Sequence, residues 1–365
     1  MTTTFSTNYS EILAQINAVH PIKYAKTRNF INGDVTYLSP YISRGVISTK
    51  QILDIIIQKG YSIYEMEKFV QELAWRDYYQ RVWQHKGSAI NADLKNTQTN
   101  ISHHQTPTNL IAAKTRIDAI DTAVTQLYQT GYMHNHCRMY TAALACNIAK
   151  AHWHNPAQWL YYNLLDGDWA SNALSWQWVA GAFSSKKYYA NQENISKYTL
   201  SNQKRSYLNI DYHQFDTLQI PDELAASEKF IATTNLPIAT TININNELPT
   251  LIYNYYNLDP QWRSTTPANR VLLLEPEIFN QYPVNNNCIN FMLNLAKNID
   301  GIQIYVGSFN QLKTTYNLNK IYYKEHPLNN YSGIEDQRDW ISNDIKDYYP
   351  SFFGYWKKLE RQLKK

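Results

Sequence analysis

The spacing of hydrophobic residues changes at about residue 220. Before that point, apolar residues recur at intervals of three and four, a pattern typical of amphipathic helices. This pattern covers residues 8–20, 48–60, 62–86, 112–130, 135–152 and 156–165. Residues 88–110 are polar and are predicted to form a loop. Because almost no strand pattern occurs before Tyr188, residues 1–220 are predicted to form an all-helical domain.

The period changes in the last third of the chain. Proline and asparagine are frequent between residues 220 and 250, which indicates a linker. Beyond it, short apolar runs predict strands, and helical patterns separate them. The strands are expected at 271–274, 302–306 and 321–323, and the helices at 286–298 and 308–316. This alternation predicts a small parallel α/β domain within residues 221–365. The expected fold class is therefore α followed by α/β.

Two polar clusters interrupt an apolar, aromatic stretch between Gly131 and Trp178. Residues 133–139 contain an amide and a permanent cation, and residues 165–172 contain two carboxylates and an amide. The five side chains are those of Asn135, Arg138, Asp166, Asp168 and Asn172. Burying them requires ion pairs and hydrogen bonds. The clusters form either a solvated surface or the wall of a pocket for a polar, planar ligand, and we favour the pocket.

The spacing within each cluster supports this interpretation. Asn135, Arg138 and Met139 share one helical face with Ala142, and Asp168 lies one turn before Asn172. Two helices that carry amides and a carboxylate–guanidinium pair would present planar groups in fixed orientations. Such a wall suits the heterocyclic edge of a flavin.

Composition restricts the class of protein. A chain of 365 residues with 44% hydrophobic content is long enough for two cores, and its 14% aromatic residues are expected to be mostly packing residues. The chain has no apolar run of 18 residues, so no membrane span is predicted. Residues 1–10 do not resemble a secretion signal. Three cysteines are too few for a four-iron cluster. We expect a cytoplasmic protein without a metal site.

The net charge of +4 is unevenly distributed. Residues 221–365 carry 14 Lys and Arg against 15 Asp and Glu, whereas residues 1–220 carry 20 against 15. A nucleic acid would therefore be expected to contact the N-terminal part of the chain through its phosphates. A solvated basic face explains the same excess, so charge alone does not decide between these alternatives.

Four segments resemble the photolyase/cryptochrome family, in the order in which that family carries them. Both polar clusters match its flavin-binding core, the second together with Trp176, Gln177 and Trp178. Residues 36–41 resemble its phosphate-binding loop, and residues 72–79 resemble its E-L-x-W-R-E-F-Y helix. The resemblance implies that residues 1–220 form an all-helical FAD-binding domain. Residues 221–365 resemble part of the α/β antenna domain, which in the family precedes the helical domain.

The resemblance implies a light-driven reaction. In photolyases, reduced FAD excited by blue light donates an electron to a cyclobutane pyrimidine dimer that is flipped out of UV-damaged DNA. The alternative is a cryptochrome-like blue-light receptor that signals through a protein partner, for which the C-terminal domain is a candidate surface. Glu72, Trp75 and Met139 favour repair, whereas the histidine at position 136, where the family has arginine, favours signalling.

The resemblance also assigns residues to the cofactor and the lesion. Asn172 matches the asparagine that faces flavin N5, Arg138 and Asp166 match an ion pair beside the ring, and Asp168 matches a neighbouring polar contact. The expected phosphate contacts are Tyr24, Thr36, Leu38, Ser39 and Arg76. The expected lesion contacts are Glu72, Trp75, Asn135, Met139 and Trp178. Asparagine rather than histidine at position 135 favours a cyclobutane dimer over a (6-4) lesion.

Electron transfer and DNA contacts complete these expectations. Trp176 matches the proximal and Trp153 the middle member of the family's tryptophan chain. The distal position falls near Asn100, where the chain has no tryptophan, so Trp83, Trp159 or a tyrosine is the expected exit. The expected DNA contacts are His136, Gln177, Lys186 and Lys187. The antenna pigment, the oligomeric state and the preference for single- or double-stranded DNA remain open.

Overall fold

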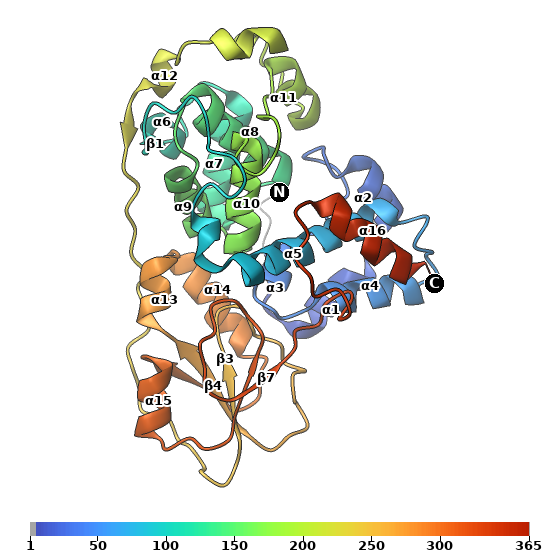
Figure 1. Cartoon of the computed structure of the whole chain (residues 1–365), viewed down its shortest axis with the longest axis vertical. Helices are drawn as coiled ribbons and strands as arrows, with labels where there is room; N and C mark the ends of the chain where they lie inside the picture. Colours follow the sequence, from blue (N-terminus) through green and yellow to red (C-terminus); the bar gives the residue numbers. More distant parts are fainter. Residues whose placement is uncertain (1–4, 365) are drawn as a thin grey trace. The chain divides into compact units, whose positions relative to one another are not determined.

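The structure of the protein is a computed structural model that describes residues 5–364 (Figure 1). Residues 1–4, part of the stretch inspected for a secretion signal, lie outside the described residues. The chain forms two compact units. Unit 1 contains His20–Val35 and His85–Ala232, and unit 2 contains Phe5–Val19, Thr36–Gln84 and the residues from Thr233 onward. This grouping follows packing rather than chain order, and the predicted domain boundary at residue 220 stays a prediction.

Unit 1 is mainly helical. Its helices are α2 (Pro21–Thr27), η1 (Gly87–Asn91), α6 (Thr108–Ile111), α7 (Asp118–Thr130), α8 (Asn135–Ala143), the π-helical turn η2 (Leu144–Ile148), α9 (His154–Asn163), α10 (Trp169–Ala180), α11 (Gln192–Thr199), η3 (Tyr212–Thr217) and α12 (Asp222–Ala225). A short antiparallel pair joins β1 (Thr106–Pro107) to β2 (Ser227–Glu228). Helix α10 packs on α8 and α9, and α7 packs on α8. This packing brings the helices of the two polar clusters together.

The loop between α7 and α8 depends on one glycine. Gly131 ends α7 in the left-handed conformation, with φ +71°. A Cβ atom at this position would lie 2.5 Å from Cγ of Leu165. Only glycine combines this backbone conformation with this close approach. The chain can therefore turn at Gly131 toward the first polar cluster, and Gly131 itself lies directly against Leu165 of the second cluster.

Unit 2 combines helices with a parallel sheet. Its helices are α1 (Tyr9–Asn17), α3 (Ser39–Ser43), α4 (Thr49–Gln58), α5 (Glu67–Lys86), α13 (Pro276–Gln281), α14 (Asn286–Ala296), α15 (Phe309–Thr315) and α16 (Phe352–Leu363). Its strands are β3 (Thr250–Tyr253), β4 (Asn269–Leu274), β5 (Ile302–Val306), β6 (Ile321–Lys324) and β7 (Ile334–Asp336).

The predicted parallel α/β arrangement is confirmed. All four strand pairs are parallel, in the order β5-β4-β3-β6-β7. The chain moves in one direction across the sheet from β4 through α13 and α14 to β5, and in the other direction from β5 through α15 to β6. Because such crossovers are right-handed, α13 and α14 are expected on one face of the sheet and α15 on the other. On the α15 face, Phe309 and Leu312 pack with Ile252, Val271 and Leu273 in a buried cluster.

Several elements differ from the sequence-based expectation. The central strand β3 begins where the predicted linker ends and was not predicted; its four residues are all buried. Strand β1 lies inside the predicted loop 88–110, and α5 begins at Glu67 rather than near residue 62. Helix α16 was not predicted. Its apolar residues Phe352, Tyr355, Trp356 and Leu359 nevertheless follow helical spacing.

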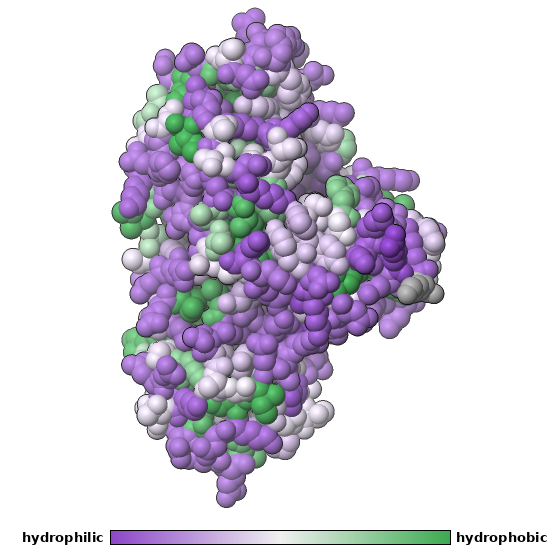
Figure 2. Space-filling view, viewed as in Figure 1, coloured by the Kyte–Doolittle hydropathy of each residue, from purple (hydrophilic) through white to green (hydrophobic). Residues whose placement is uncertain are grey.

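The surface shows no extended apolar region on the face drawn in Figure 2, where hydrophilic residues predominate and hydrophobic ones form small, separate groups. Large exposed apolar side chains on the molecule include Ile231, Ile238 and Phe353. Within residues 5–364, none of the helices is both long and apolar enough to cross a bilayer.

Candidate functional site

The two polar clusters meet in unit 1. The backbone N–H of Leu165 donates to the carbonyl of Gly131 over 2.8 Å. At the next residue, the carboxylate of Asp166 accepts hydrogen bonds from the guanidinium of Arg138. Segments more than 25 residues apart in the sequence are thus joined by a main-chain bond and a charge-assisted pair.

The guanidinium of Arg138 is held at three points. Its Nη2 donates to both carboxylate oxygens of Asp166 at 2.9 Å, and its Nε donates to the carbonyl of Met133 at 2.7 Å. The side chain of Asp166 is 2% exposed and that of Arg138 is 21% exposed. The predicted ion pair is therefore confirmed. Its geometry fixes the plane of the guanidinium and leaves Nη1 free of any hydrogen bond recorded among the described residues.

Asp168 and Asn172 have different local partners at the start of α10. Asp168 caps this helix, because its Oδ1 accepts from the backbone N–H of Ser171 at 2.8 Å. Asn172 donates through Nδ2 to the carbonyl of Ala157 on α9, at 2.9 Å. Because a carbonyl oxygen can only accept, this bond assigns the nitrogen and the oxygen of the Asn172 amide. The Oδ1 of Asn172 remains as an acceptor in a partly exposed position.

Two histidines precede Arg138 at the start of α8. His134 caps this helix, with Nδ1 accepting from the N–H of His136 at 3.2 Å. Burial and the neighbouring positive charge of Arg138 and of any protonated His136 lower the pKa of His134 to about 4. Burial and the charge of Arg28 lower the pKa of His136 to about 4 as well. Both imidazoles are therefore neutral at pH 7.

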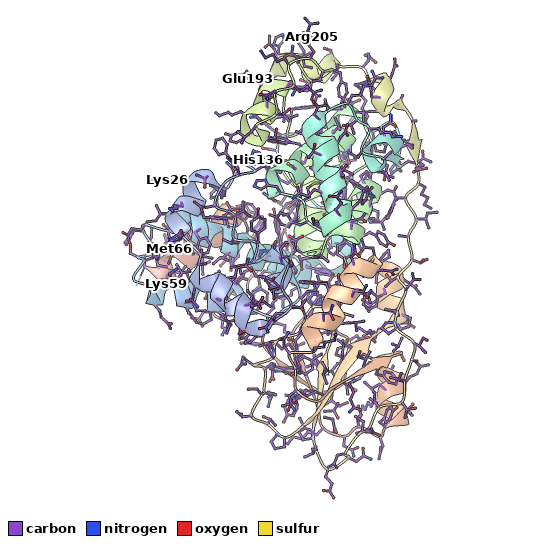
Figure 3. The ribbon with its side chains drawn as sticks, turned by 180° about the vertical axis from the view of Figure 1, so that it is seen from behind. Lys26, Lys59, Met66, His136, Glu193 and Arg205 are labelled. Carbon is purple, nitrogen blue, oxygen red and sulfur yellow. The ribbon has the colours of Figure 1, made fainter. Side chains whose placement is uncertain are left out.

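His136, which is labelled in Figure 3, is half-buried rather than freely exposed. Its ring contacts those of Tyr140 and Tyr198, at centroid distances of 5.2 and 4.7 Å. A neutral ring packed in this way does not replace the permanent charge of the arginine that the family carries there. The DNA role assigned to His136 stays a prediction.

Three other residues assigned to the lesion lie in unit 1. Asn135 is exposed at the first position of α8, and Met139 is half-buried one turn later. Trp178 is 37% exposed, and its ring lies 5.8 Å from that of Tyr188. Tyr24, a predicted phosphate contact, is half-buried within α2. These side chains have the accessibility that a ligand contact requires, but their roles stay predictions.

The predicted phosphate loop lies in unit 2. Leu38 precedes α3 and its N–H donates to Oγ1 of Thr36 at 3.4 Å, while the carbonyl of Thr36 accepts from Gln15. Arg76 on α5 donates to Oγ of Ser43 at the end of α3, over 3.0 Å. The two motifs that the resemblance assigns to the phosphates, including Ser39 at the start of α3, are therefore neighbours within this unit.

Trp75, the predicted base-stacking residue of α5, is covered on one face. Its ring is stacked on that of Phe352, with centroids 3.8 Å apart and an interplanar angle of 9°. Tyr78 and Tyr79 approach it at 5.7 and 5.2 Å. Glu72, one turn before, is half-buried. Phe352 therefore covers one face of the indole in this conformation, and the role of Trp75 at the lesion stays a prediction.

The tryptophans assigned to electron transfer are buried. Trp176 is 2% exposed and Trp153 is 0% exposed. The indole Nε1 of Trp153 donates to Oδ1 of Asp93 at 2.8 Å, and the same oxygen lies 3.3 Å from Nε2 of His152. Sequence reasoning missed Asp93 because it lies in a loop that carries no motif.

The candidate exits for the electron differ in their access to solvent. In unit 1, Nε1 of Trp159 donates to the hydroxyl of Tyr128 at 3.0 Å, and Tyr128 is 40% exposed. In unit 2, Trp83 is 1% exposed and packs against Tyr282 and His326. Of these two tryptophans, Trp159 is linked through Tyr128 to the surface, which favours it over Trp83 as the exit for the electron.

One predicted DNA contact is wrong. Gln177 is 0% exposed, its Nε2 donates to the carbonyl of Ile90, and its Oε1 accepts from the N–H of Leu94. Its helical position directs it inward, where it satisfies the backbone of η1 and the following turn. Lys186 is exposed, and Lys187 is half-buried with Nζ donating to the carbonyl of Thr99.

No group of three or more His, Cys, Asp or Glu that could hold a metal ion occurs within the described part of the chain. The donor set of unit 1 instead suits an organic ring. Arg138 offers an unused N–H direction, and Asn172 offers an acceptor whose orientation is fixed. A flavin edge presents both carbonyl oxygens and ring N–H groups, so the residues present fit FAD.

Comparison with known proteins identifies this class of site. Residues 69–208 match the model of the FAD binding domain of DNA photolyase. A deoxyribodipyrimidine photo-lyase of Alkalihalophilus pseudofirmus is 32% identical over 162 residues, which cover 43% of this chain and 34% of that protein. The photo-lyase of Escherichia coli is 28% identical over 170 residues, covering 43% of this chain and 35% of the other. The chain thus spans about a third of the length of these relatives.

A solved structure gives a partial superposition. The cryptochrome of Synechocystis sp. PCC6803 is 24% identical, with a TM-score of 0.49, and the match covers 54% of this chain and 44% of that one. The segment that carries both polar clusters is therefore similar to the FAD binding domain of DNA photolyase.

Proposed function

We propose that the protein binds FAD and uses light to repair cyclobutane pyrimidine dimers in UV-damaged DNA. The observation that carries this proposal is the joined pair of polar clusters, in which Arg138, Asp166 and Asn172 have fixed orientations within the segment that matches the family. The relatives described above are photo-lyases by name, which favours repair over signalling.

In this proposal, unit 1 holds the flavin ring. Arg138 would donate to a ring carbonyl through Nη1, while Asp166 neutralises and orients the guanidinium. Asn172 would accept from a ring N–H through Oδ1, since its Nδ2 donates to Ala157. When bound, FAD supplies the light absorption and the electron, whereas the protein supplies binding, orientation and electrostatics.

The acceptor at Asn172 favours a reduced ring. The flavin N5 position carries a hydrogen only after reduction, so an oxygen acceptor discriminates in favour of that form. One hydrogen bond in a partly buried site contributes on the order of 1 kcal/mol. Asn172 is therefore a positioning residue that shifts the redox balance toward the form needed for repair.

The remaining assignments follow the family resemblance. We propose Tyr24, Thr36, Leu38, Ser39 and Arg76 as contacts of the FAD phosphates. For the dimer, we propose Glu72, Trp75, Asn135, Met139 and Trp178. Stacking of a base on an aromatic ring contributes about 1–3 kcal/mol.

The proposal is tested with purified protein loaded with FAD. The reduced protein is mixed with an oligonucleotide that contains one thymine dimer, and restored thymines are scored in blue light and in the dark. Light-dependent restoration is expected. Bound FAD without any restoration would favour the signalling alternative, and failure to bind FAD would contradict the proposal altogether.

Asn172 provides the sharper variant. Asn172→Leu is expected to retain FAD but to favour its reduced form about fivefold less, because the acceptor is lost. The measurement is a redox titration followed by flavin absorbance. Ser171→Ala, in the same turn of α10, is the matched control and should leave the midpoint unchanged. Equal shifts in the two variants would refute the role of Asn172.

A further inference from the structure

Helix α16 supplies the ring that covers Trp75. Phe352 lies parallel to the indole at 3.8 Å, and Trp356 continues the stack, 6.4 Å from Phe352 at 16°. Phe352 also meets Tyr78 edge-on at 5.9 Å. The stacking distance and angle are those that a nucleobase on Trp75 would need. The same face of one indole cannot hold both partners.

The side chains of α16 are divided between two faces. Phe352, Tyr355, Trp356 and Leu359 are buried at intervals of three and four, so this side of the helix packs inward. Phe353, directly beside Phe352, is 68% exposed. One of two adjacent phenylalanines is therefore seated on Trp75 while its neighbour extends into solvent.

Besides this apolar packing, polar contacts also link α16 and the residues before it to α5. The hydroxyl of Tyr78 donates to the carbonyl of Tyr349 at 3.2 Å, and Lys364 lies 3.6 Å from Glu67 in a partly exposed ion pair. Such pairs contribute little to stability. Residues 337–351 contain no helix or strand, so α16 can move without breaking a sheet or another helix.

We propose that the segment Ser351–Leu363 is an internal occupant of the Trp75 stacking face and that it must leave before a base can stack there. This inference rests on the proposed function, because it is the damaged base that requires Trp75. In the free protein, the conformation in which Trp75 is uncovered is then only a fraction of the population. The measured affinity for the lesion is reduced by that fraction.

The test compares full-length, FAD-loaded proteins in the dark. The probe is a single-stranded oligonucleotide with one thymine dimer, with the undamaged oligonucleotide as reference, and binding is measured by fluorescence anisotropy. Phe352→Ala removes the competing ring and is expected to bind the dimer about 3- to 10-fold more tightly, the factor that corresponds to one aromatic pair. Phe353→Ala is the matched control and should bind like the unchanged protein.

A second variant protects the test against misfolding. Phe352→Leu keeps an apolar side chain at this buried position but removes the flat ring, so it should retain the helix and still bind the dimer more tightly. In the Phe352→Ala background, Trp75→Ala should abolish the gain. Hydrogen exchange of the α16 amides should accelerate when the unchanged protein binds the dimer.

The outcomes separate this inference from the proposed function. Equal or weaker binding by both Phe352 variants, or unchanged exchange in α16 on binding, would overturn the internal occupant while leaving repair intact. If the unchanged protein and every variant bound damaged and undamaged oligonucleotides equally, the proposed function would fail, and the inference with it.

Discussion

The polar clusters of unit 1 and the aromatic helix α5 of unit 2 both resemble one family, yet the structure treats them differently. In unit 1, the functional groups satisfy one another: Arg138 is held by Asp166 and Met133, and Asn172 is held by Ala157. In unit 2, Trp75 is covered by Phe352, which belongs to a helix near the other end of the sequence.

The difference follows from the chemistry of the groups. A buried cation needs its counter-ion and hydrogen bonds in every state of the protein, so its partners lie within the same unit. An aromatic face has no such requirement and can exchange one flat partner for another at modest cost. The polar groups of unit 1 are therefore preorganised. The indole of Trp75 on α5, by contrast, can exchange one aromatic partner for another.

The largest expected effect tests preorganisation in unit 1. Asp166→Ala leaves Arg138 largely buried without its counter-ion and should lower the free energy of unfolding by about 3 kcal/mol. The measurement is chemical denaturation followed by circular dichroism. Asp168→Ala, which removes a helix cap, should lower it by about 1 kcal/mol. Equal losses would mean that the pair contributes no more than a cap.

A smaller effect is expected from pH. The pKa of His134 in the folded protein is about 4, below the ordinary value of 6.5. Its contribution is therefore complete above pH 6.5 and is lost as the pH falls toward 4, because the unfolded chain binds the proton more readily. Protonation would also remove the acceptor that His136 uses.

The expected loss from His134 alone is about 2 kcal/mol of unfolding free energy between pH 7 and pH 5, and His136, whose pKa is also lowered to about 4, adds its own loss. The measurement is denaturation at both values. His134→Asn, whose amide oxygen can still accept from His136, should show a weaker pH dependence. Other buried histidines, including His154, leave a residual slope. An unchanged slope in the variant would show that His134 is not a source of it.

The smallest effect concerns an exposed positive charge. Lys186 is exposed, whereas Nζ of Lys187 donates to the carbonyl of Thr99 at 2.7 Å. If Lys186 contacts a phosphate, Lys186→Ala should reduce the slope of log affinity against log salt by about 1. DNA binding at several salt concentrations measures this. An identical salt slope in Lys186→Ala and the unchanged protein would remove Lys186 from the DNA surface.

Local patterns predicted much of this architecture. Helical periodicity located α1, α4, α7, α9 and α14, and apolar runs located β4, β5 and β6. The ion pair of Arg138 with Asp166 also followed from its motifs. Strand β3 was missed because its short run directly follows a segment rich in asparagine and proline, whose composition indicates a linker.

The sequence by itself determined which residues could carry the chemistry: the amides, the guanidinium and the carboxylates, at spacings that place them on helical faces. Only the tertiary structure decided that Gln177 faces inward, that Asp93 holds Trp153, and that Phe352 covers Trp75. The physical reason is that spacing along a helix fixes its own faces, whereas the partner of each face comes from a distant segment and depends on packing.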